Sequence, residues 1–145
     1  MVSMSNILIM IQKFNHRYTS MIQKEAQRAG VSKIELDILL FLRNNPSFDT
    51  AKDIVEYRGM AKSYVSKTLE QLKEQGFIEL NEDAHDRRLQ RIQLTAKSLP
   101  IANQAKRAQE QFYRHILKGI PEQSILEMKD IFRKIRDNID DKEEF

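Results

Sequence analysis

The stretch of sequence that decides the fold is GMAKSYVSKTLEQLKEQGFIELNEDAHDRRLQRIQLT, residues 59–95. Its first part predicts a helix, because Val65, Leu69 and Leu72 recur at helical spacing and place one apolar face toward a core. Gly76 follows that helix, and a glycine just past a C-terminus commonly ends one. The stretch therefore opens with an amphipathic helix that stops at a defined residue.

The rest of the same stretch predicts a β-hairpin. Residues 77–80 and 89–94 interleave β-prone apolar residues with polar ones, which indicates two strands, and the charged residues 81–88 form the turn between them. A helix, a glycine stop and a charged hairpin in this order build a winged helix-turn-helix that reads DNA, with the hairpin as its wing.

Two further helices are predicted before this stretch. Ser32 and Glu35 have the spacing of a capping box, and they open a helix that is apolar nearly all round and is therefore expected to be buried. Thr50 can cap a short helix that ends near Tyr57, and Gly59 lies in the turn to the next helix. This short helix and the recognition helix after Gly59 form the helix-turn-helix pair.

Long amphipathic helices are predicted at both ends of the chain. The first spans residues 5–29, a second starts at Thr95, where Pro100 implies either a later start or a kink, and a third starts near Pro121. Their apolar stripes could pack within the chain, but a two-fold homodimer is the more economical hypothesis. The residues predicted at its interface are Ile7, Ile11, Phe14, Ile131, Ile135 and Ile139.

The predicted fold is mainly α with a small two-stranded β wing. A winged helix-turn-helix core at 32–94 is flanked by N- and C-terminal dimerisation helices at 5–29 and 96–140, and all of them belong to one domain, residues 1–145.

Short polar and cationic side chains near the start of the helix after Gly59 lie away from its apolar face, where a recognition helix enters a major groove. An ordinary solvated face is the alternative for these residues, and Tyr64 fits either core packing or a phosphate contact. The wing arginines either contact DNA or balance the acidic residues of the hairpin. We predict that residues 62–68 enter the major groove and residues 81–91 lie against the backbone or minor groove. The predicted contacts are Lys62, Ser63, Tyr64, Ser66, Lys67, His85, Arg87, Arg88 and Arg91.

The deciding stretch resembles the MarR family of bacterial transcriptional regulators, whose signature is a recognition helix, a glycine, a short strand, a wing of form D-x-R-D-x-R and a second strand closing on Leu-Thr. Gly76, residues 83–88 and Leu94-Thr95 match it. The resemblance implies that Asp86 holds a wing arginine in place, with Arg88 as its partner. His85 replaces the family's first wing arginine, so either the wing tip stays out of the minor groove or Arg87 inserts.

The same resemblance implies a homodimer on a pseudo-palindromic operator in double-stranded DNA. It also implies a small aromatic or phenolic effector, held between the dimerisation and DNA-binding lobes. Plain interhelical packing is the alternative for the side chains that are candidates to line such a cavity, which are His16, Tyr18, Phe112 and Tyr113.

Composition and motifs exclude several other classes. No cysteine is present, and His16, His85 and His115 lack metal-ligand spacing, so we predict no metal and no cofactor. We find no phosphate-binding glycine loop and no nucleophile motif, and predict that the protein is not an enzyme. No apolar run is long enough for a membrane span and no basic leader is present, which predicts a cytoplasmic protein with no membrane partner.

Net charge decides little. The chain carries +3 overall, but residues 50–94 hold eight basic and eight acidic side chains, so DNA binding would depend on where the charges lie. The sequence predicts a sequence-specific DNA-binding transcriptional regulator, a repressor released by a small-molecule effector. The alternative is a protein-interaction adaptor that kept the winged fold and lost specific DNA binding, which the neutral lobe and His85 favour.

Overall fold

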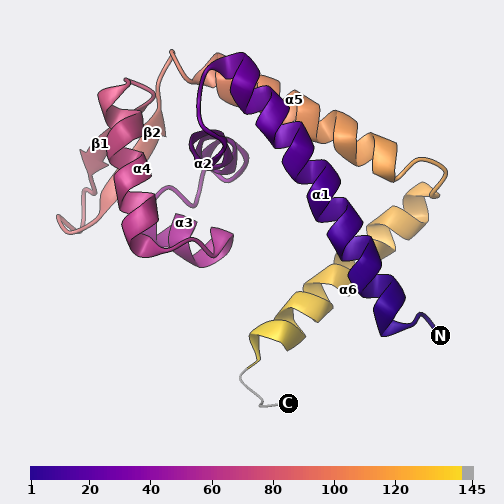
Figure 1. Cartoon of the computed structure of the whole chain (residues 1–145). Helices are drawn as coiled ribbons and strands as arrows, with labels where there is room; N and C mark the ends of the chain where they lie inside the picture. Colours follow the sequence, from indigo (N-terminus) through magenta and orange to yellow (C-terminus); the bar gives the residue numbers. More distant parts are fainter. Residues whose placement is uncertain (142–145) are drawn as a thin grey trace. The chain divides into compact units, whose positions relative to one another are not determined.

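The computed structural model describes residues 1–141 of the chain, so the last four residues of the predicted domain lie outside it. Six helices and a two-stranded sheet occur in that range (Figure 1). The chain divides into two compact units, and the division falls between Phe112 and Tyr113. The elements are α1 (Met4–Ala29), α2 (Lys33–Asn44), α3 (Ala51–Arg58), α4 (Lys62–Glu74), β1 (Ile78–Glu82), β2 (Gln90–Leu94), α5 (Leu99–Ile116) and α6 (Glu122–Asp140).

Side-chain caps begin α2 and α3 where the sequence predicts them. The Thr50 hydroxyl accepts a hydrogen bond from the Asp53 N–H at 3.2 Å, and the Asp53 carboxylate accepts one from the Thr50 N–H at 3.1 Å, which completes a capping box. The Ser32 hydroxyl likewise accepts from the Glu35 N–H at 3.2 Å. The predicted box at Ser32 is only half formed, because among residues 1–141 the Ser32 N–H donates no hydrogen bond to the Glu35 carboxylate, and Oε2 of Glu35 is buried without a partner.

Gly76 ends α4 as predicted, and its backbone explains why a glycine is needed there. Its φ of 75° lies in the left-handed region, which strains any side chain. The N–H of Gly76 donates to the Lys73 carbonyl at 3.0 Å, and the N–H of Phe77 donates to the Leu72 carbonyl at 2.9 Å. These two bonds form a Schellman motif, which satisfies carbonyls at the end of the helix and turns the chain into β1.

The strands of the hairpin differ in their bounds from the prediction, since each begins one residue later. Its strands are antiparallel, with Ile78 opposite Leu94 and Glu82 opposite Gln90, so β1 extends two residues past the predicted end and the turn shrinks to residues 83–89. The backbone N–H of Ile92 also donates to the carbonyl of Asp49 at 2.8 Å. The wing is therefore fastened to the segment that leads into α3.

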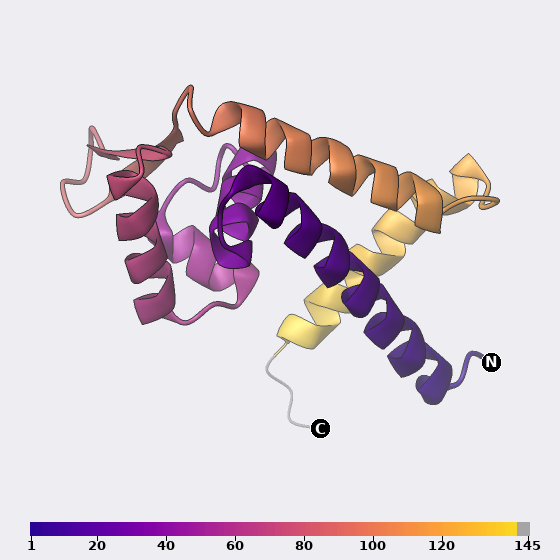
Figure 2. The same ribbon diagram turned by 45° about the horizontal axis from the view of Figure 1, so that its top comes forward.

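Two hydrophobic clusters share α2. The winged core buries the predicted apolar face of α4, with Val65 and Leu72 at 0% exposure, against α2, α3 and the sheet. On its other side α2 packs against α1 and α5 (Figure 2). The predicted burial of α2 on nearly all sides is thus confirmed. The second cluster consists of Ile22, Ala26, Leu36, Leu40 and Ala105.

Helix α5 begins later than Thr95, which decides between the two alternatives that Pro100 left open. Residues 96–98 form a turn, and α5 begins at Leu99, so Pro100 lies in the first helical turn, where its missing N–H costs little. Ser98 is fully buried, and its hydroxyl donates to the Phe77 carbonyl at 2.6 Å and accepts from the Thr95 N–H at 3.2 Å. These bonds fix the start of α5 on the sheet.

In the second unit, α6 is amphipathic and none of its residues is buried. The apolar side chains at its C-terminal half remain exposed, including Ile131, Ile135 and Ile139. Within residues 1–141, no helix combines the length and apolarity that crossing a bilayer would require.

Candidate nucleic-acid interface

The start of α4 presents the polar face that the sequence predicts. Lys62, Ser63, Ser66 and Lys67 are exposed, while Val65 points into the core. Tyr64 is 53% exposed, so packing into the core does not account for it.

Thr68 differs from the other residues of the predicted reading segment 62–68. It is buried, and its hydroxyl donates to the Tyr64 carbonyl at 2.8 Å. Thr68 therefore supports the helix and cannot reach a groove. The reading face ends at Lys67.

The first turn of α4 favours an anion. Ala61 at the N-cap makes no side-chain capping bond, and no acidic residue occurs in the first turn. The free backbone N–H groups and the helix dipole create a positive potential there, to which Lys62 adds its charge. The carboxylates of α4 lie farther along, since Glu70 is eight residues from Lys62, or about 12 Å along the helix axis.

The wing turn is held by aspartates that accept backbone hydrogen bonds. One carboxylate oxygen of Asp83 accepts from the N–H groups of His85 and Asp86, both at 3.0 Å, and the carboxylate of Asp86 accepts from the Arg88 N–H at 2.9 Å. Asp86 thus pairs with Arg88, the partner that the resemblance implies, but its bond goes to the backbone N–H of Arg88. Such local bonds give the tip a defined shape.

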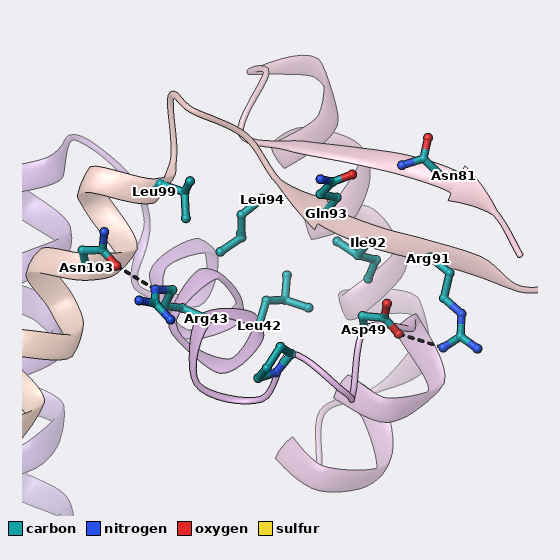
Figure 3. A pocket seen from close by; sticks show the side chains of 11 residues that line it. Leu42, Arg43, Asp49, Asn81, Arg91, Ile92, Gln93, Leu94, Leu99 and Asn103 are labelled. Atoms are coloured by element: carbon teal, nitrogen blue, oxygen red, sulfur yellow. Dashed lines mark hydrogen bonds and ion pairs between the residues drawn. The ribbon is translucent and has the colours of Figure 1, made fainter.

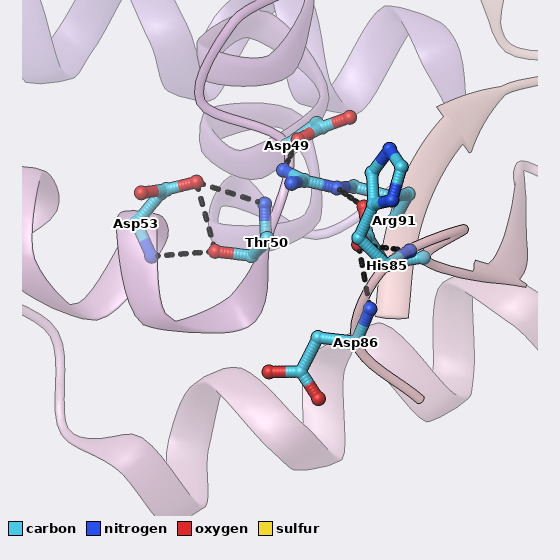
Figure 4. Close-up of polar contacts among 7 residues, drawn as sticks. Asp49, Thr50, Asp53, His85, Asp86 and Arg91 are labelled. Atoms are coloured by element: carbon cyan, nitrogen blue, oxygen red, sulfur yellow. Dashed lines mark hydrogen bonds and ion pairs between the residues drawn. The ribbon is translucent and has the colours of Figure 1, made fainter. Parts of the chain in front are cut away.

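The side chain of Arg91 bridges two carboxylates. Its Nε donates to Asp83 at 2.9 Å and its Nη1 donates to Asp49 at 2.7 Å (Figure 4). The hydrogen bond from Arg91, followed by that from the His85 N–H, lowers the pKa of Asp83, and the bonds to Asp83 and Asp49 raise the pKa of Arg91. Because Asp49 precedes the N-cap of α3, this bridge ties the wing to the helix-turn-helix.

The wing arginines thus fall into two groups. Arg91 balances acidic residues, as one alternative held, whereas Arg87 and Arg88 are exposed and form no ion pair with the described residues. Lys62 and Lys67 likewise have no carboxylate within 4.0 Å among residues 1–141. The lobe has no net charge, but the cations that form no ion pair within residues 1–141 include residues at the start of α4 and at the tip of the wing.

Asp49 is the residue that sequence reasoning missed. It lies 42 positions before Arg91, outside the hairpin, and no spacing rule connects the two. Its place just before a helix N-cap was visible, but its partner was not.

Two of the candidate effector residues pack against each other. Tyr18 and Phe112 pack edge to face with ring centres 5.6 Å apart, and Phe14 completes the aromatic cluster. His16 is exposed on α1, and Tyr113 belongs to the second unit. For Tyr18 and Phe112 the packing alternative describes what the structure shows.

A small polar pocket does lie beside Tyr18. Its volume of ≈ 130 Å³ holds about four water molecules, and Asp37, Arg58 and Gln109 contribute to its lining. Gln109 donates to the Tyr18 hydroxyl at 2.7 Å, and burial raises the pKa of that hydroxyl. No group of three or more acidic or histidine side chains in residues 1–141 could hold a metal ion.

Comparison with known proteins links this geometry to one family. Residues 29–89 match the model of the MarR family. A MarR family transcriptional regulator from Listeria monocytogenes, solved with a 26mer DNA, shares the fold with a TM-score of 0.80 at 18% identity, over 96% of this chain and 90% of that one. A MarR family regulator from Silicibacter pomeroyi gives a TM-score of 0.77 at 20% identity, covering 94% and 90%. MepR from S. aureus, in a complex with DNA, gives 0.74 at 17% identity, covering 94% and 96%. The shared fold extends over nearly the whole chain.

Proposed function

Residues 29–89 match the model of the MarR family, and on that premise we propose that this chain is a member of that family, a sequence-specific DNA-binding transcriptional regulator that acts as a homodimer. The observation that carries the proposal is the start of α4, where a helix end without a side-chain cap lies beside exposed hydroxyls and lysines that form no ion pair within residues 1–141. Two of the structural relatives were solved with DNA, which supports the same role here.

In this proposal the first two turns of α4 enter the major groove. Ser63 and Ser66 are short enough to approach base edges, where a hydroxyl both donates and accepts. Lys62 and Lys67 contact phosphates or guanine, and Tyr64 reaches a phosphate with its hydroxyl.

In this proposal some arginines of the wing contact DNA, and another holds the wing in position. Arg87 and Arg88, exposed and unpaired among the described residues, contact the backbone or the minor groove, with His85 beside them at the tip. Arg91 acts as a positioning residue, since its Nε and Nη1 are engaged by two carboxylates.

The dimer is proposed from exposed apolar surface. Along the N-terminal half of α1 the apolar side chains are exposed on every side of the helix, and Ile11 is still 44% exposed. On α6 the side chain of Ile135 is 46% exposed. Burying such surface against a second copy would stabilise the assembly and place two recognition helices about 34–36 Å apart, one turn of DNA.

In this proposal the protein represses transcription by occupying promoter DNA. A dimer bound to promoter DNA blocks polymerase, and a small aromatic or phenolic effector that binds a conformation with a different spacing of the recognition helices would release it by population shift.

The test is a selection of binding sites from random duplex DNA, followed by affinity measurements over a range of salt concentrations. We expect a pseudo-palindrome with half-sites about 10 base pairs apart and an affinity that falls as salt rises. Recovery of only weak binding without sequence preference would refute the proposal. That result would favour the adaptor function, which the equal numbers of acidic and basic residues in the lobe support.

A further inference from the structure

A groove of ≈ 610 Å³ opens beside the wing, and the proposed contacts with DNA do not use it. It lies between the end of α2, the segment before α3, strand β2 and the start of α5 (Figure 3). Leu42, Leu94 and Leu99 make part of the lining apolar, and the volume is in the range of small-molecule sites. All of these elements belong to the first unit, so the groove is complete within one body.

Arg43 lines one end of this groove with an oriented and unneutralised charge. Its Nε donates to the Asn103 side-chain oxygen at 2.7 Å, which fixes the plane of the guanidinium. Its Nη1 and Nη2 donate no hydrogen bond to residues 1–141, and no carboxylate in that range lies within 4.0 Å of it. A guanidinium that is held in one plane, with free N–H donors on Nη1 and Nη2, can bind a carboxylate through two parallel hydrogen bonds.

The far end of the groove carries the Arg91–Asp49 ion pair, at 2.7 Å. The charged lining residues are therefore two arginines and one aspartate, and the excess is positive. A neutral or cationic ligand would leave Arg43 uncompensated, whereas an anion with an apolar body satisfies both the guanidinium and the leucines.

We propose that this groove binds an organic anion, whose carboxylate pairs with Arg43 and whose aromatic or short aliphatic body covers Leu42, Leu94 and Leu99. The site is separate from the polar pocket beside Tyr18, with which it shares no lining residue. The apolar body supplies affinity through buried area, and Arg43 selects the charge.

Binding in the groove reaches the wing by a short route. Arg91 and Asp49 line the groove and also hold the wing to the start of α3. A ligand whose carboxylate pairs with Arg43 and whose body fills the groove to its far end meets the Arg91–Asp49 ion pair, which changes how firmly the wing is held. This coupling to DNA rests on the proposed function, whereas the binding site itself does not.

The test uses the whole protein and 2-naphthoate as the probe, measured by calorimetry and by chemical shifts without DNA. We expect saturable binding, with shifts at Leu42, Leu94 and Leu99, and weaker binding of the neutral 2-naphthamide. Arg43→Met should weaken 2-naphthoate binding by roughly tenfold or more, as expected for loss of a charge-assisted pair. Arg107→Met removes an exposed arginine of α5 outside the groove and should leave affinity unchanged.

Other results overturn the proposal. They are absence of saturable binding, shifts confined to residues around Tyr18, or equal affinity in wild type and Arg43→Met. Arg43→Lys guards against misfolding, because it keeps the charge but loses the fork, and should bind with intermediate affinity. Ligand binding that leaves DNA affinity unchanged refutes the coupling alone. Ligand binding by a protein that never binds DNA specifically refutes the proposed function and supports the site.

Discussion

The winged core and the exposed apolar helices of this chain have similar side chains in opposite environments. In the winged core, Ile38, Ile54 and Leu72 are fully buried. Along the first half of α1 and along α6, isoleucines of the same kind stay exposed. The first region is stabilised by its own contacts, whereas the second has apolar surface that a single chain leaves in water. Substitutions in the two regions should therefore differ in how their effect on the free energy of unfolding depends on protein concentration.

The largest effect is expected from a cavity in the winged core. Leu72→Ala removes a fully buried side chain from α4 and should lower the free energy of unfolding by about 3 kcal/mol. Chemical denaturation at two protein concentrations measures this loss. The matched change Ile11→Ala, on exposed α1, should cost less at low protein concentration and more at high concentration, where the dimer forms. Equal losses for both variants would contradict the contrast between the regions.

The second prediction concerns the proposed dimer. Ile135→Asp places a carboxylate without a partner in the interface, which should cost a few kcal/mol of association and give monomers or unfolded chain in sedimentation. Asn138→Asp adds the same charge at another exposed position of α6 and is the control. A folded dimer of Ile135→Asp would show that α6 does not lie at the interface.

The winged core does not depend on the exposed lysines and arginines at its surface. The proposed DNA contacts can therefore be removed without unfolding the protein. Lys67→Ala and Arg87→Ala should each weaken DNA binding and lower the slope of log affinity against log salt by roughly one per lost phosphate contact. Lys73→Ala, in the last turn of α4, should change neither quantity. Unchanged affinity in both of the first two variants would remove these residues from the proposed interface.

Arg91→Gln offers a sharper contrast within the wing. It should weaken DNA binding because the wing loses its bridge to Asp49 and Asp83, but the salt slope should stay the same since, in the proposed function, Arg91 positions the wing and contacts no phosphate. A slope that falls as in Arg87→Ala would mean that Arg91 contacts DNA directly.

The smallest expected effect is a change in the pKa of one carboxyl group in the wing. The pKa of Asp83 is lowered by its hydrogen bond from Arg91, so the folded state gains stability above the ordinary aspartate pKa and loses it only as the pH falls through the lower, folded value. The bridge should therefore stay intact at neutral pH. Carboxyl chemical shifts measured against pH should place Asp83 below its usual range, and Arg91→Gln should return it toward that range. An ordinary pKa in the wild type would contradict the bridge.

Features set by neighbours in sequence were predictable. The apolar spacing of Val65, Leu69 and Leu72 located α4, and the side chains of Thr50 and Asp53 located the start of α3. These depend on helical periodicity and on bonds across three residues, both of which a sequence displays.

Features set by tertiary contact were not predictable. The extension of β1 to Glu82 depends on pairing with polar residues of β2, which apolar alternation does not mark. The bridge from Arg91 to Asp49 and the bond from Ser98 to Phe77 join residues 42 and 21 positions apart. The resemblance paired Asp86 with Arg88, but it did not indicate that the bond goes to the backbone of Arg88 or that Asp83 binds the side chain of Arg91.

The position of α2 between two clusters also has a mechanical consequence. Leu39 belongs to the winged core, and Leu36 and Leu40 pack with α1 and α5, so the helix is a wall common to both compartments. A hinge motion at α2 would have to break the packing of both clusters at once. The recognition helix and the adjoining turns of α1 and α5 therefore travel as one rigid block. In the proposed dimer, we therefore expect any change in the distance between two such blocks to arise outside these two clusters.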